Sequence, residues 1–304
     1  MQKFNEIQKV YNEIVTSAIA NEYNKFEKQT DILPLVNKLH EMLIKYANEV
    51  KEERRKKMKF INHNIEQDKE MYQDYSHTYT FVVCHKPFED KFGDISNKVY
   101  LTDFKDFSKE SGAILADSVY DSKVFGEITF WDYIYKTIRN EDCACLCAYR
   151  RKIYPRIGIQ VANPIEFPCT VLQQLAHYHS PIVVDALTKA LPKEELAVLN
   201  GNLFVPYNIF CAPRQVIGDW LSFVIPRVTQ TMQILGCPQD IKGAKEWVQT
   251  TDLIKPAKDK NNSLDYQARV GAFISERINS IFWLTRNYGQ TYQDVRLLEP
   301  GQVI

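Results

Sequence analysis

The chain has 304 residues, of which 45% are hydrophobic and 25% are charged, an ordinary balance for a globular protein. It is long enough for one large core or for two domains. Lysine and arginine together number 38, as do aspartate and glutamate, so the formal net charge is zero. This balance provides no general field for a polyanion, and nucleic acid is not expected as a partner. No apolar run approaches the length of about 20 residues that crosses a bilayer, so no transmembrane segment is predicted.

The cysteines and the first residues of the chain bear on its compartment. Seven cysteines are an odd number, and they lack the spacing of a disulfide framework, which indicates reduced thiols. The opening MQKFNEIQKVYNE is charged throughout and lacks the apolar core of a signal peptide. These features predict a cytoplasmic protein, either free or attached peripherally to the inner face of a membrane.

Residues 1–75 are predicted to form a helical accessory module. Hydrophobic residues recur there at three- and four-residue steps in two segments, which can bury each other as a helical hairpin. The basic run Arg54–Lys59 either touches anionic lipid headgroups or forms a solvated helix face beside neighbouring glutamates. We expect the module to dock to a partner or to self-associate, which would make the protein a homo-oligomer.

A β-rich apolar segment, Tyr79–Cys84, is predicted to be the first strand of an α/β domain. Pro87 halts the strand and leaves His85 and Lys86 at its carboxyl end, where open α/β sheets bind their ligands. These two residues either contact a base, ribose or diphosphate of a nucleotide, or belong to an ordinary polar loop. Neither GxGxxG nor GxxxxGK occurs, so ATP- or NAD-dependent chemistry on those scaffolds is disfavoured.

The segment Phe125–Arg151 carries the strongest pattern in the chain. Its first part, to Arg139, has its hydrophobic residues on one helical face. Glu127 lies near the start of this helix and Lys136 in its last turns, where each charge interacts favourably with the helix dipole. The apolar run Cys143–Tyr149 follows and is typical of a strand buried on both faces of a parallel sheet.

Arg150 and Arg151 end this strand. A guanidinium group offers paired donors that match phosphate oxygens, so an anionic ligand is expected at the carboxyl end of the strand. The alternative is that both arginines pair with acids such as Glu141, Asp142 or Glu166. The alternating cysteines of the strand are interpreted as buried thiols, because period-two spacing on a flat strand rarely gives a tetrahedral zinc site.

The C-terminal half is predicted to be mostly helical. Hydrophobic periodicity indicates helices over residues 185–199, 215–235 and 265–284. Residues 291–304 lack such a pattern and are predicted to be an irregular tail.

Polar residues in this half are candidates for contacts with a ligand. Asn202 opens a second predicted strand, Leu203–Tyr207, and could donate a hydrogen bond to a hydroxyl group of a ligand. His177 and His179 stand two residues apart, so on a helix they diverge and do not share a metal. Each is either a residue of a binding site or an ordinary histidine at a surface or helix end.

Five short motifs follow one another along the chain. They are VVCHKP at 82–87, FGEIT with its helix and LCAYRR between 125 and 151, NLFV at 202–205, WLSF at 220–223, and RVGAFISER at 269–277. In these motifs and their order, about residues 79–284 resemble the family of capsular and exopolysaccharide glycosyltransferases catalogued as domain of unknown function 4422. Three positions depart from the family pattern. Ala148 stands where the family has histidine, Gly126 replaces a cysteine, and Thr137 replaces an asparagine.

The resemblance implies a fold and an activity. The fold is α/β, with a GT-A-like nucleotide-sugar-binding sheet flanked by helices over residues 76–290. The activity is that of a hexosyltransferase-like glycosyltransferase. It would move a sugar from a nucleotide-diphosphate donor, with a UDP-sugar as the first candidate, to a glycan or lipid-linked acceptor. The product would be a surface polysaccharide (capsule, exopolysaccharide or O-antigen).

The resemblance also suggests roles for single residues. Asp265 and Glu276 are the carboxylates expected to act in catalysis, one of them by taking the proton of the acceptor hydroxyl. Glu276 could instead form a structural ion pair with Arg277. The acceptor-side residues are expected to be His177, His179 and Arg269. The donor-binding residues are expected to be His85, Lys86, Glu127, Lys136, Tyr149, Arg150, Arg151 and Asn202.

Metal dependence and a rival function remain open at this point. No Asp-x-Asp motif ends the central strand, so we expect Arg150 and Arg151 to neutralise the leaving diphosphate without a metal. Mg²⁺ or Mn²⁺ on carboxylate oxygens is the alternative. The rival function is that of a non-catalytic partner or scaffold protein whose sugar-nucleotide domain has decayed, to which Ala148 would point. Binding of nucleoside diphosphates distinguishes the two functions.

Overall fold

The computed structural model describes the second part of the chain almost throughout and the first part at isolated positions. The chain divides into two compact units, Met1–Gln67 and Asp68–Ile304. The described positions of the first unit are helical, whereas its predicted docking or self-association lies outside the described residues. The described residues are 10, 34, 37–39, 41, 42, 45, 77–84, 98–148, 151–154, 158–251 and 263–297.

The second unit is built on a sheet of nine strands among the described residues. These strands are β1 (His77–Val83), β2 (Lys98–Thr102), β3 (Ile114–Leu115), β4 (Asp142–Ala148), β5 (Arg151–Lys152), β6 (Gln160–Ala162), β9 (Phe210–Pro213), β10 (Thr291–Gln293) and β11 (Arg296–Leu297). Seven of them lie in the order β10, β6, β9, β4, β1, β2, β3, while β5 pairs with β4 and β11 with β5. Neighbours along the path of seven are parallel except at β9, which is antiparallel to β4 and β6.

The parallel strands β1, β2 and β4 end at one edge of the sheet, which we call the carboxyl edge. Their last residues are Val83, Thr102 and Ala148. Strand β4 lies between β1 and β9, and its first six residues, Asp142 to Cys147, are buried, as predicted for the apolar run that begins at Cys143. The carboxyl edge is where ligands bind to open α/β sheets.

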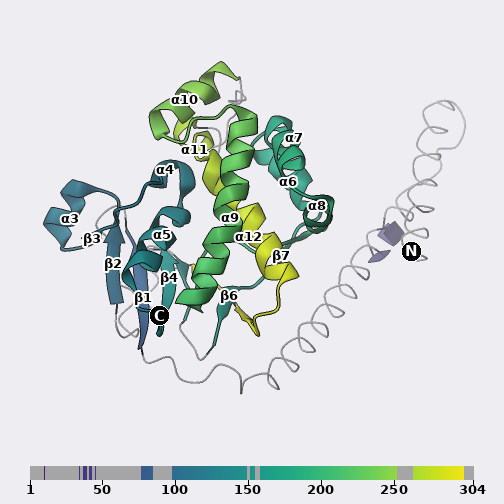
Figure 1. Ribbon diagram of the computed structural model, residues 1–304. Helices are drawn as coiled ribbons and strands as arrows, with labels where there is room; N and C mark the ends of the chain where they lie inside the picture. Colours follow the sequence, from purple (N-terminus) through teal and green to yellow (C-terminus); the bar gives the residue numbers. More distant parts are fainter. Residues whose placement is uncertain are drawn as a thin grey trace, which may run out of the picture. The chain divides into compact units, whose positions relative to one another are not determined.

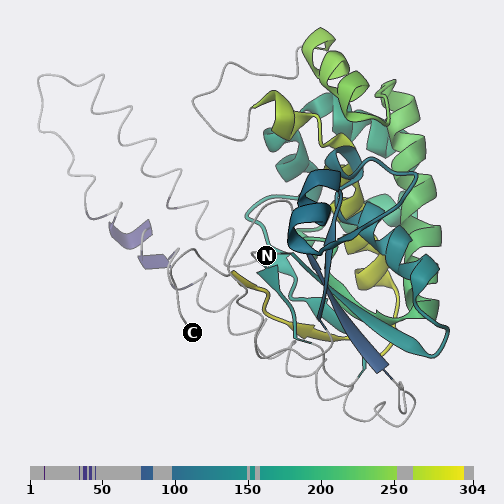
Figure 2. The same cartoon turned by 90° about the vertical axis from the view of Figure 1, so that its left-hand side faces the viewer.

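Three long helices cover one face of the sheet, as Figures 1 and 2 show: α5 (Glu127–Thr137), α9 (Arg214–Leu235) and α12 (Val270–Thr285). Each carries a buried tryptophan toward Phe210 of β9. The ring centroids of Trp131, Trp220 and Trp283 lie 4.1, 5.3 and 5.1 Å from that of Phe210. Stacked and edge-on aromatic contacts of this kind join the helical layer to the sheet. The predicted α/β class, a mostly parallel sheet flanked by helices, is confirmed.

The opposite face of the sheet carries a smaller hydrophobic cluster. Cys145 and Cys147 of β4 belong to it, together with Cys211 of β9, which pairs with Cys145. Burial raises the pKa of the Cys145 thiol well above its ordinary value, so the thiol is neutral. These cysteines are therefore hydrophobic packing groups, in keeping with their interpretation from the sequence.

The other helices are shorter, and two of them correct the sequence prediction. A single helix was predicted over residues 185–199, but Pro192 separates α7 from α8, because proline ends a helix at the residue before it. The helix predicted over 265–284 is also divided, and Arg269 is the N-cap of α12. The shorter helices are α3 (Lys105–Ser111), α4 (Ser122–Phe125), α6 (Val171–Tyr178), α7 (Pro181–Ala190), α8 (Lys193–Leu199), α10 (Ile241–Thr250) and α11 (Leu264–Gln267).

Two predictions about strands are wrong, one for residues 203–207 and one for residues 291–304. Only Leu203–Phe204 of the predicted strand 203–207 is extended; it forms β8, which pairs with β7 (Ile165–Glu166) in a separate two-stranded sheet. The main sheet uses β9 instead. The tail predicted to be irregular contributes β10 and β11, because pairing with β6 and β5 satisfies backbone groups that no local pattern announces.

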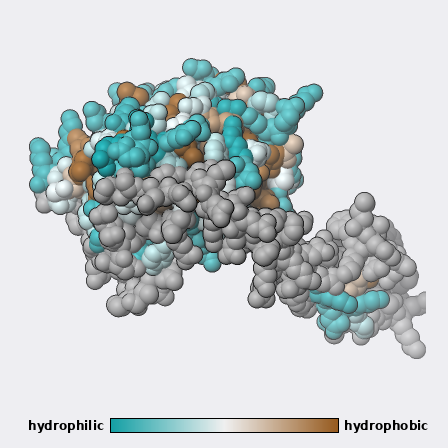
Figure 3. All heavy atoms as spheres, turned by 60° about the horizontal axis from the view of Figure 1, so that its bottom comes forward, coloured by the Kyte–Doolittle hydropathy of each residue, from teal (hydrophilic) through white to brown (hydrophobic). Residues whose placement is uncertain are grey.

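Hydrophobic side chains on the described surface are dispersed. On the face drawn in Figure 3 they form separate small patches among hydrophilic residues. Single exposed hydrophobic side chains are normal on globular proteins. Among the described residues, none of the helices combines the length and the hydrophobicity that a bilayer span requires.

Candidate functional site

Charged side chains from several elements meet at the carboxyl edge, around Glu276 of α12. Arg151 pairs through its backbone with Ala148, the last residue of β4, and so lies at the end of the central strand. Glu127 lies in the first turn of α5. The charges of Glu127, Arg151, Arg269 and Arg277 all act on the carboxyl group of Glu276. We call these five residues the charged cluster.

A glycine permits the close approach of α12 and α5 on which the cluster depends. Gly126, between α4 and α5, has φ 59°, and a Cβ atom built on it would lie 3.0 Å from Cβ of Ala272 and 3.8 Å from Nη2 of Arg269. A larger residue would have to adopt an unfavourable backbone conformation and push the first turn of α12 away. Gly126 therefore keeps Arg269 close to the start of α5.

The Glu276 carboxyl is a half-buried acid whose environment pulls its pKa in two directions. Its side chain is 23% exposed, and Nη1 of Arg277 donates to Oε2 of Glu276 at 3.3 Å. Burial raises the pKa of Glu276 above its ordinary value, as does the charge of Glu127, while Arg277, Arg151 and Arg269 oppose the rise. A carboxylate with a raised pKa among charged groups is suited to accept a proton.

Two arginines of the cluster keep an unused donor. The Arg277 side chain is 3% exposed; it donates to the Phe273 carbonyl at 3.2 Å and to the side chain of Gln174. Among the described residues, Nε of Arg277 and Nε of Arg151 are buried without a hydrogen-bond partner. Buried polar groups are nearly always satisfied, so two idle guanidinium donors beside a carboxylate indicate a place for an anionic ligand.

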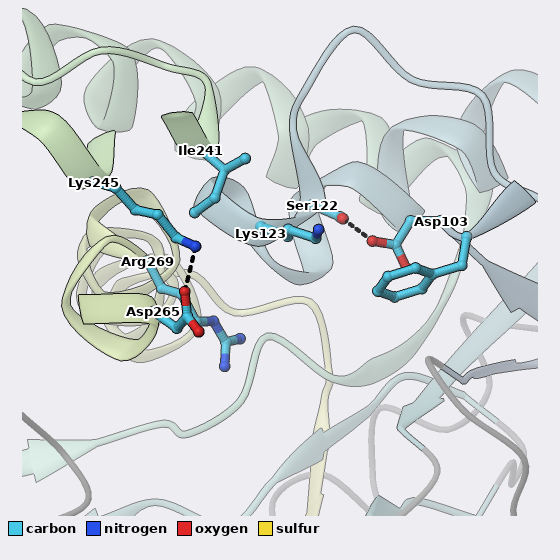
Figure 4. Close-up of a pocket in the computed structure, with 8 residues that line it drawn as sticks. Asp103, Ser122, Lys123, Ile241, Lys245, Asp265 and Arg269 are labelled. Carbon is cyan, nitrogen blue, oxygen red and sulfur yellow. Dashed lines mark hydrogen bonds and ion pairs between the residues drawn. The ribbon is translucent and has the colours of Figure 1, made fainter. Parts of the chain in front are cut away.

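A cavity of about 370 Å³ adjoins the cluster through Arg269. It lies between the loop after β2, the start of α4, and helices α10 and α11 (Figure 4). Its lining combines three cationic side chains with two carboxylates and one aromatic ring. The lining residues are Asp103, Phe104, Ser122, Lys123, Ile241, Lys245, Asp265 and Arg269.

Asp265, expected from the sequence to be catalytic, lies in this cavity and not in the charged cluster. Its side chain is 80% exposed and forms an ion pair with Lys245 (Figure 4). A hydrogen bond and the charge of Lys245 hold the pKa of Asp265 below its ordinary value, with a further contribution from Lys123. An exposed carboxylate that is already paired is a weak base, so the geometry favours Glu276 over Asp265.

Lys136 and Asn202, expected to bind the donor, have other partners. Lys136 lies at the far end of α5 from Glu127, on the order of 13 Å along the helix axis. Its side chain is 55% exposed, and Nζ pairs with Asp132 at 2.7 Å. Nδ2 of Asn202 donates to Oε1 of Glu166 at 2.7 Å, next to the two-stranded sheet. Neither residue belongs to the charged cluster.

The two histidines expected on the acceptor side differ in environment. His177 is exposed on α6 and has an edge contact with Tyr178. His179 is buried, and its ring stacks on Phe273 at 3.7 Å while Nδ1 lies 3.3 Å from Oε1 of Gln267. His179 therefore packs behind the cluster and does not face an open site.

The burial of His179 predicts an acid-sensitive fold. Burial and the charge of Arg277 lower the pKa of His179 to about 3, below the value of an unfolded chain. Between these two pKa values His179 is protonated in the unfolded state and neutral in the folded state. The free energy of unfolding therefore decreases as the pH falls from about 6.5 toward 3, by at most about 1.4 kcal/mol per pH unit. Urea unfolding at several pH values should show a smaller slope for His179→Phe than for wild type. An unchanged slope would contradict this assignment, and His177→Phe is the exposed control.

Four residues expected to bind the donor lie outside the described residues: His85, Lys86, Tyr149 and Arg150. Their roles remain predictions. Conversely, no sequence pattern pointed to Lys123, Lys245 or Tyr207, because only the folded chain brings these residues to the cavity or to Arg151. The ring of Tyr207 lies against Arg151, 3.9 Å from ring centroid to guanidinium carbon.

The charged cluster does not suit a divalent cation. Mg²⁺ and Mn²⁺ prefer several carboxylate or carbonyl oxygens. Glu127 and Glu276 share their surroundings with Arg151, Arg269 and Arg277, whose positive charges would repel a metal ion. Within the part of the chain that the structure describes, no group of three or more His, Cys, Asp or Glu side chains is placed to hold a metal.

Comparisons with known proteins give one weak likeness. No protein-family model matches the chain, and no curated protein does. A solved structure, the apo form of the bifunctional glycosyltransferase WbbM, aligns with 74% of the chain at 11% sequence identity and a TM-score of 0.49. The chain spans about half of that protein, 46% of its length. A likeness at this level assigns no activity to the chain.

Proposed function

We propose that the protein is a glycosyltransferase that moves a sugar from a nucleotide-diphosphate donor to an acceptor hydroxyl. The observation that carries the proposal is the convergence of Arg151, Arg269 and Arg277 on Glu276 at the carboxyl edge, beside a cavity of about 370 Å³. This volume lies within the range of small-molecule sites. The motifs that resemble capsular and exopolysaccharide glycosyltransferases support the same function.

The arginines would stabilise the departing nucleoside diphosphate. Sugar transfer passes through an oxocarbenium-like state, and negative charge develops on the leaving group. Preorganised cationic donors at that point lower the barrier, because they need not reorient as the charge appears. Within the described part of the chain, Nε of Arg151 and Nε of Arg277 have no hydrogen-bond partner, and Arg269 connects the cluster with the cavity. We place the diphosphate at the cluster and the nucleoside in the cavity.

Glu276 would act as the general base. An inverting transfer requires a carboxylate that removes the proton of the attacking hydroxyl. Burial raises the pKa of Glu276 above that of an ordinary glutamate, which strengthens it as a base, while the charges of the neighbouring arginines limit the rise. The acceptor is a glycan or a lipid-linked glycan of a surface polysaccharide in this proposal, and the donor is first of all a UDP-sugar.

Nucleoside diphosphates should bind without a metal. In EDTA, UDP or GDP at about 100 times its dissociation constant should raise the melting temperature by about 5 to 10 °C, because a ligand specific for the fold contributes about 2.7 kcal/mol there. Differential scanning fluorimetry measures the shift. A shift seen only with Mn²⁺ would overturn the metal-independent site, and none with either would favour the non-catalytic partner protein.

The donor itself is identified by hydrolysis. UDP-, GDP- and CMP-sugars are incubated singly with the full-length protein, and release of the free nucleotide is followed by chromatography. The wild-type protein should hydrolyse one class of donor, and Arg151→Ala should lose this activity. Arg214→Ala is the matched control, because Arg214 also stacks on a tyrosine, Tyr135, at 4.2 Å, but follows β9 at the opposite edge of the sheet.

A further inference from the structure

The turn at Tyr207–Asn208 has an unfavourable backbone. Tyr207 has φ 77° and Asn208 φ 45°, both in the left-handed region. Asparagine tolerates this region, whereas a bulky aromatic residue rarely occupies it. Strain of this kind persists only where the surrounding structure enforces it, and such residues gather at binding sites.

Two hydrogen bonds hold the turn against the helices of the charged cluster. Asn208 is fully buried, and its Nδ2 donates to Oγ of Ser275 at 2.7 Å. The carbonyl of Asn208 accepts a hydrogen bond from Nε1 of Trp131 at 2.8 Å. Ser275 precedes Glu276 on α12, and Trp131 lies one turn after Glu127 on α5. The turn is thus tied to both helices that carry the carboxylates of the cluster.

The turn presents the ring of Tyr207 to Arg151. The guanidinium carbon lies 3.9 Å from the ring centroid, well within cation–π distance. A guanidinium group that lies on a ring keeps its N–H groups in its own plane, where they can still donate to an anion. Nε of Arg151 has no partner among the described residues, and the charge of Arg151 acts on Glu276.

We propose that Tyr207 is a positioning residue for Arg151, an inference that rests on the proposed function. Its ring, held in a left-handed turn, fixes Arg151 so that one cation both receives the donor diphosphate and faces the Glu276 carboxylate. Without the ring, the Arg151 side chain would exchange among solvated rotamers, and both interactions would weaken.

We expect the other groups that face Glu276 to keep their positions when Tyr207 is changed. They come from α5, α11 and α12 and do not touch the ring in any contact that the structure describes. A change in the titration of Glu276 in a Tyr207 variant therefore reports on Arg151. The charged and titratable groups around Glu276 are Glu127, Arg151, Tyr266, Arg269 and Arg277.

Variants at position 207 separate the ring from the fold. Tyr207→Asn removes the ring and keeps a residue that tolerates the left-handed region, so it should fold at least as well as wild type. Tyr207→Phe keeps the ring and should behave as wild type. Tyr135→Leu is the matched control, because it removes another tyrosine ring on which an arginine, Arg214, stacks.

Binding of UDP by calorimetry is the first measurement. Tyr207→Asn should weaken UDP about 2- to 30-fold, the range that corresponds to loss of a cation–π contact that holds the binding group. Tyr207→Phe and Tyr135→Leu should stay close to wild type. Equal affinity of wild type and Tyr207→Asn would overturn the proposal.

The second measurement requires no substrate. Titration of the glutamate carboxyl carbons by NMR, with the Glu276 signal assigned by its loss in Glu276→Gln, should give a higher pKa for Glu276 in Tyr207→Asn than in wild type, because Arg151 lowers that pKa. An unchanged pKa would overturn the positioning role. If wild type does not bind UDP, the proposed function fails, while this titration still tests whether Tyr207 positions Arg151.

Discussion

Replacing Glu276 by glutamine will slow sugar transfer by about 10²- to 10⁴-fold, the usual contribution of a positioned general base. Glutamine has nearly the same shape, and its amide oxygen can still accept from Nη1 of Arg277, but it cannot take a proton. The dissociation constant for UDP should change little, because the arginines that would hold the diphosphate stay in place. The loss should therefore appear in kcat and not in donor binding.

The pH dependence of the wild-type rate tests the same assignment. A base acts when it is deprotonated, so the rate should fall on the acid side, with a midpoint above that of an ordinary glutamate because burial raises the pKa of Glu276. This acid limb should be lost in Glu276→Gln. Initial rates with saturating donor and acceptor across the pH range measure it. A variant that keeps the wild-type rate would remove Glu276 from the mechanism.

Glu195→Gln is the matched control for this substitution. Glu195 is also a half-buried glutamate paired with an arginine, since its side chain is 16% exposed and Oε1 lies 2.6 Å from Nη2 of Arg227. It lies on α8 and is not part of the charged cluster. The control should lose some stability and keep its rate. Asp265→Asn should lower the rate far less than Glu276→Gln, because Asp265 is exposed and already paired with Lys245.

Replacing Arg269 by alanine should lower kcat/KM by about 10²- to 10³-fold, as expected for loss of one preorganised group that stabilises developing negative charge. Arg269 is the residue common to the cavity and to the surroundings of Glu276. The substitution removes one positive charge. That charge would stabilise the diphosphate, and it also lowers the pKa of Glu276. The acid limb of the pH–rate profile should therefore move to higher pH.

Steady-state kinetics of Arg269→Ala beside Arg214→Ala measures this effect. Both variants lose an arginine at the N-terminal end of a helix, but Arg214 lies at the other edge of the sheet, where its Nε donates to the Tyr135 carbonyl. Lysine at position 269 should restore part of the activity, because it keeps the charge and loses the planar donors. Equal losses in the Arg269 and Arg214 variants would indicate a general effect on the fold and not on the site.

Elements with a long, regular hydrophobic pattern could be predicted from the sequence. Helix α9 begins and ends within one residue of the predicted 215–235, and β4 was predicted as a buried central strand. In both, burial on a fixed face imposes a period that local sequence displays. Strand β9 has only four residues, FCAP, and its place between β4 and β6 depends on partners distant in the chain. No local period could indicate it.

The candidate site shows the same division. Position at the end of an element singled out Glu127 and Arg151, because charged groups at strand ends and helix starts lie at the carboxyl edge of such a sheet. Arg269 and Glu276 were chosen from the motifs that resemble the glycosyltransferase family. The same reasoning chose Lys136, which the helix carries to the opposite end and pairs with Asp132. A motif can identify a residue, but the direction and length of the helix decide at which edge of the sheet that residue lies.

Chemistry that depends on environment could not be inferred from the chain alone. The choice between Asp265 and Glu276 rests on which carboxyl is buried, and the neutral state of His179 on the rings stacked around it. Burial, and with it the pKa of a group, is the sum of contacts from segments that only folding brings together. Composition and hydrophobic period therefore specify an α/β protein with cations at the carboxyl edge. The tertiary contacts specify with which carboxylate those cations interact.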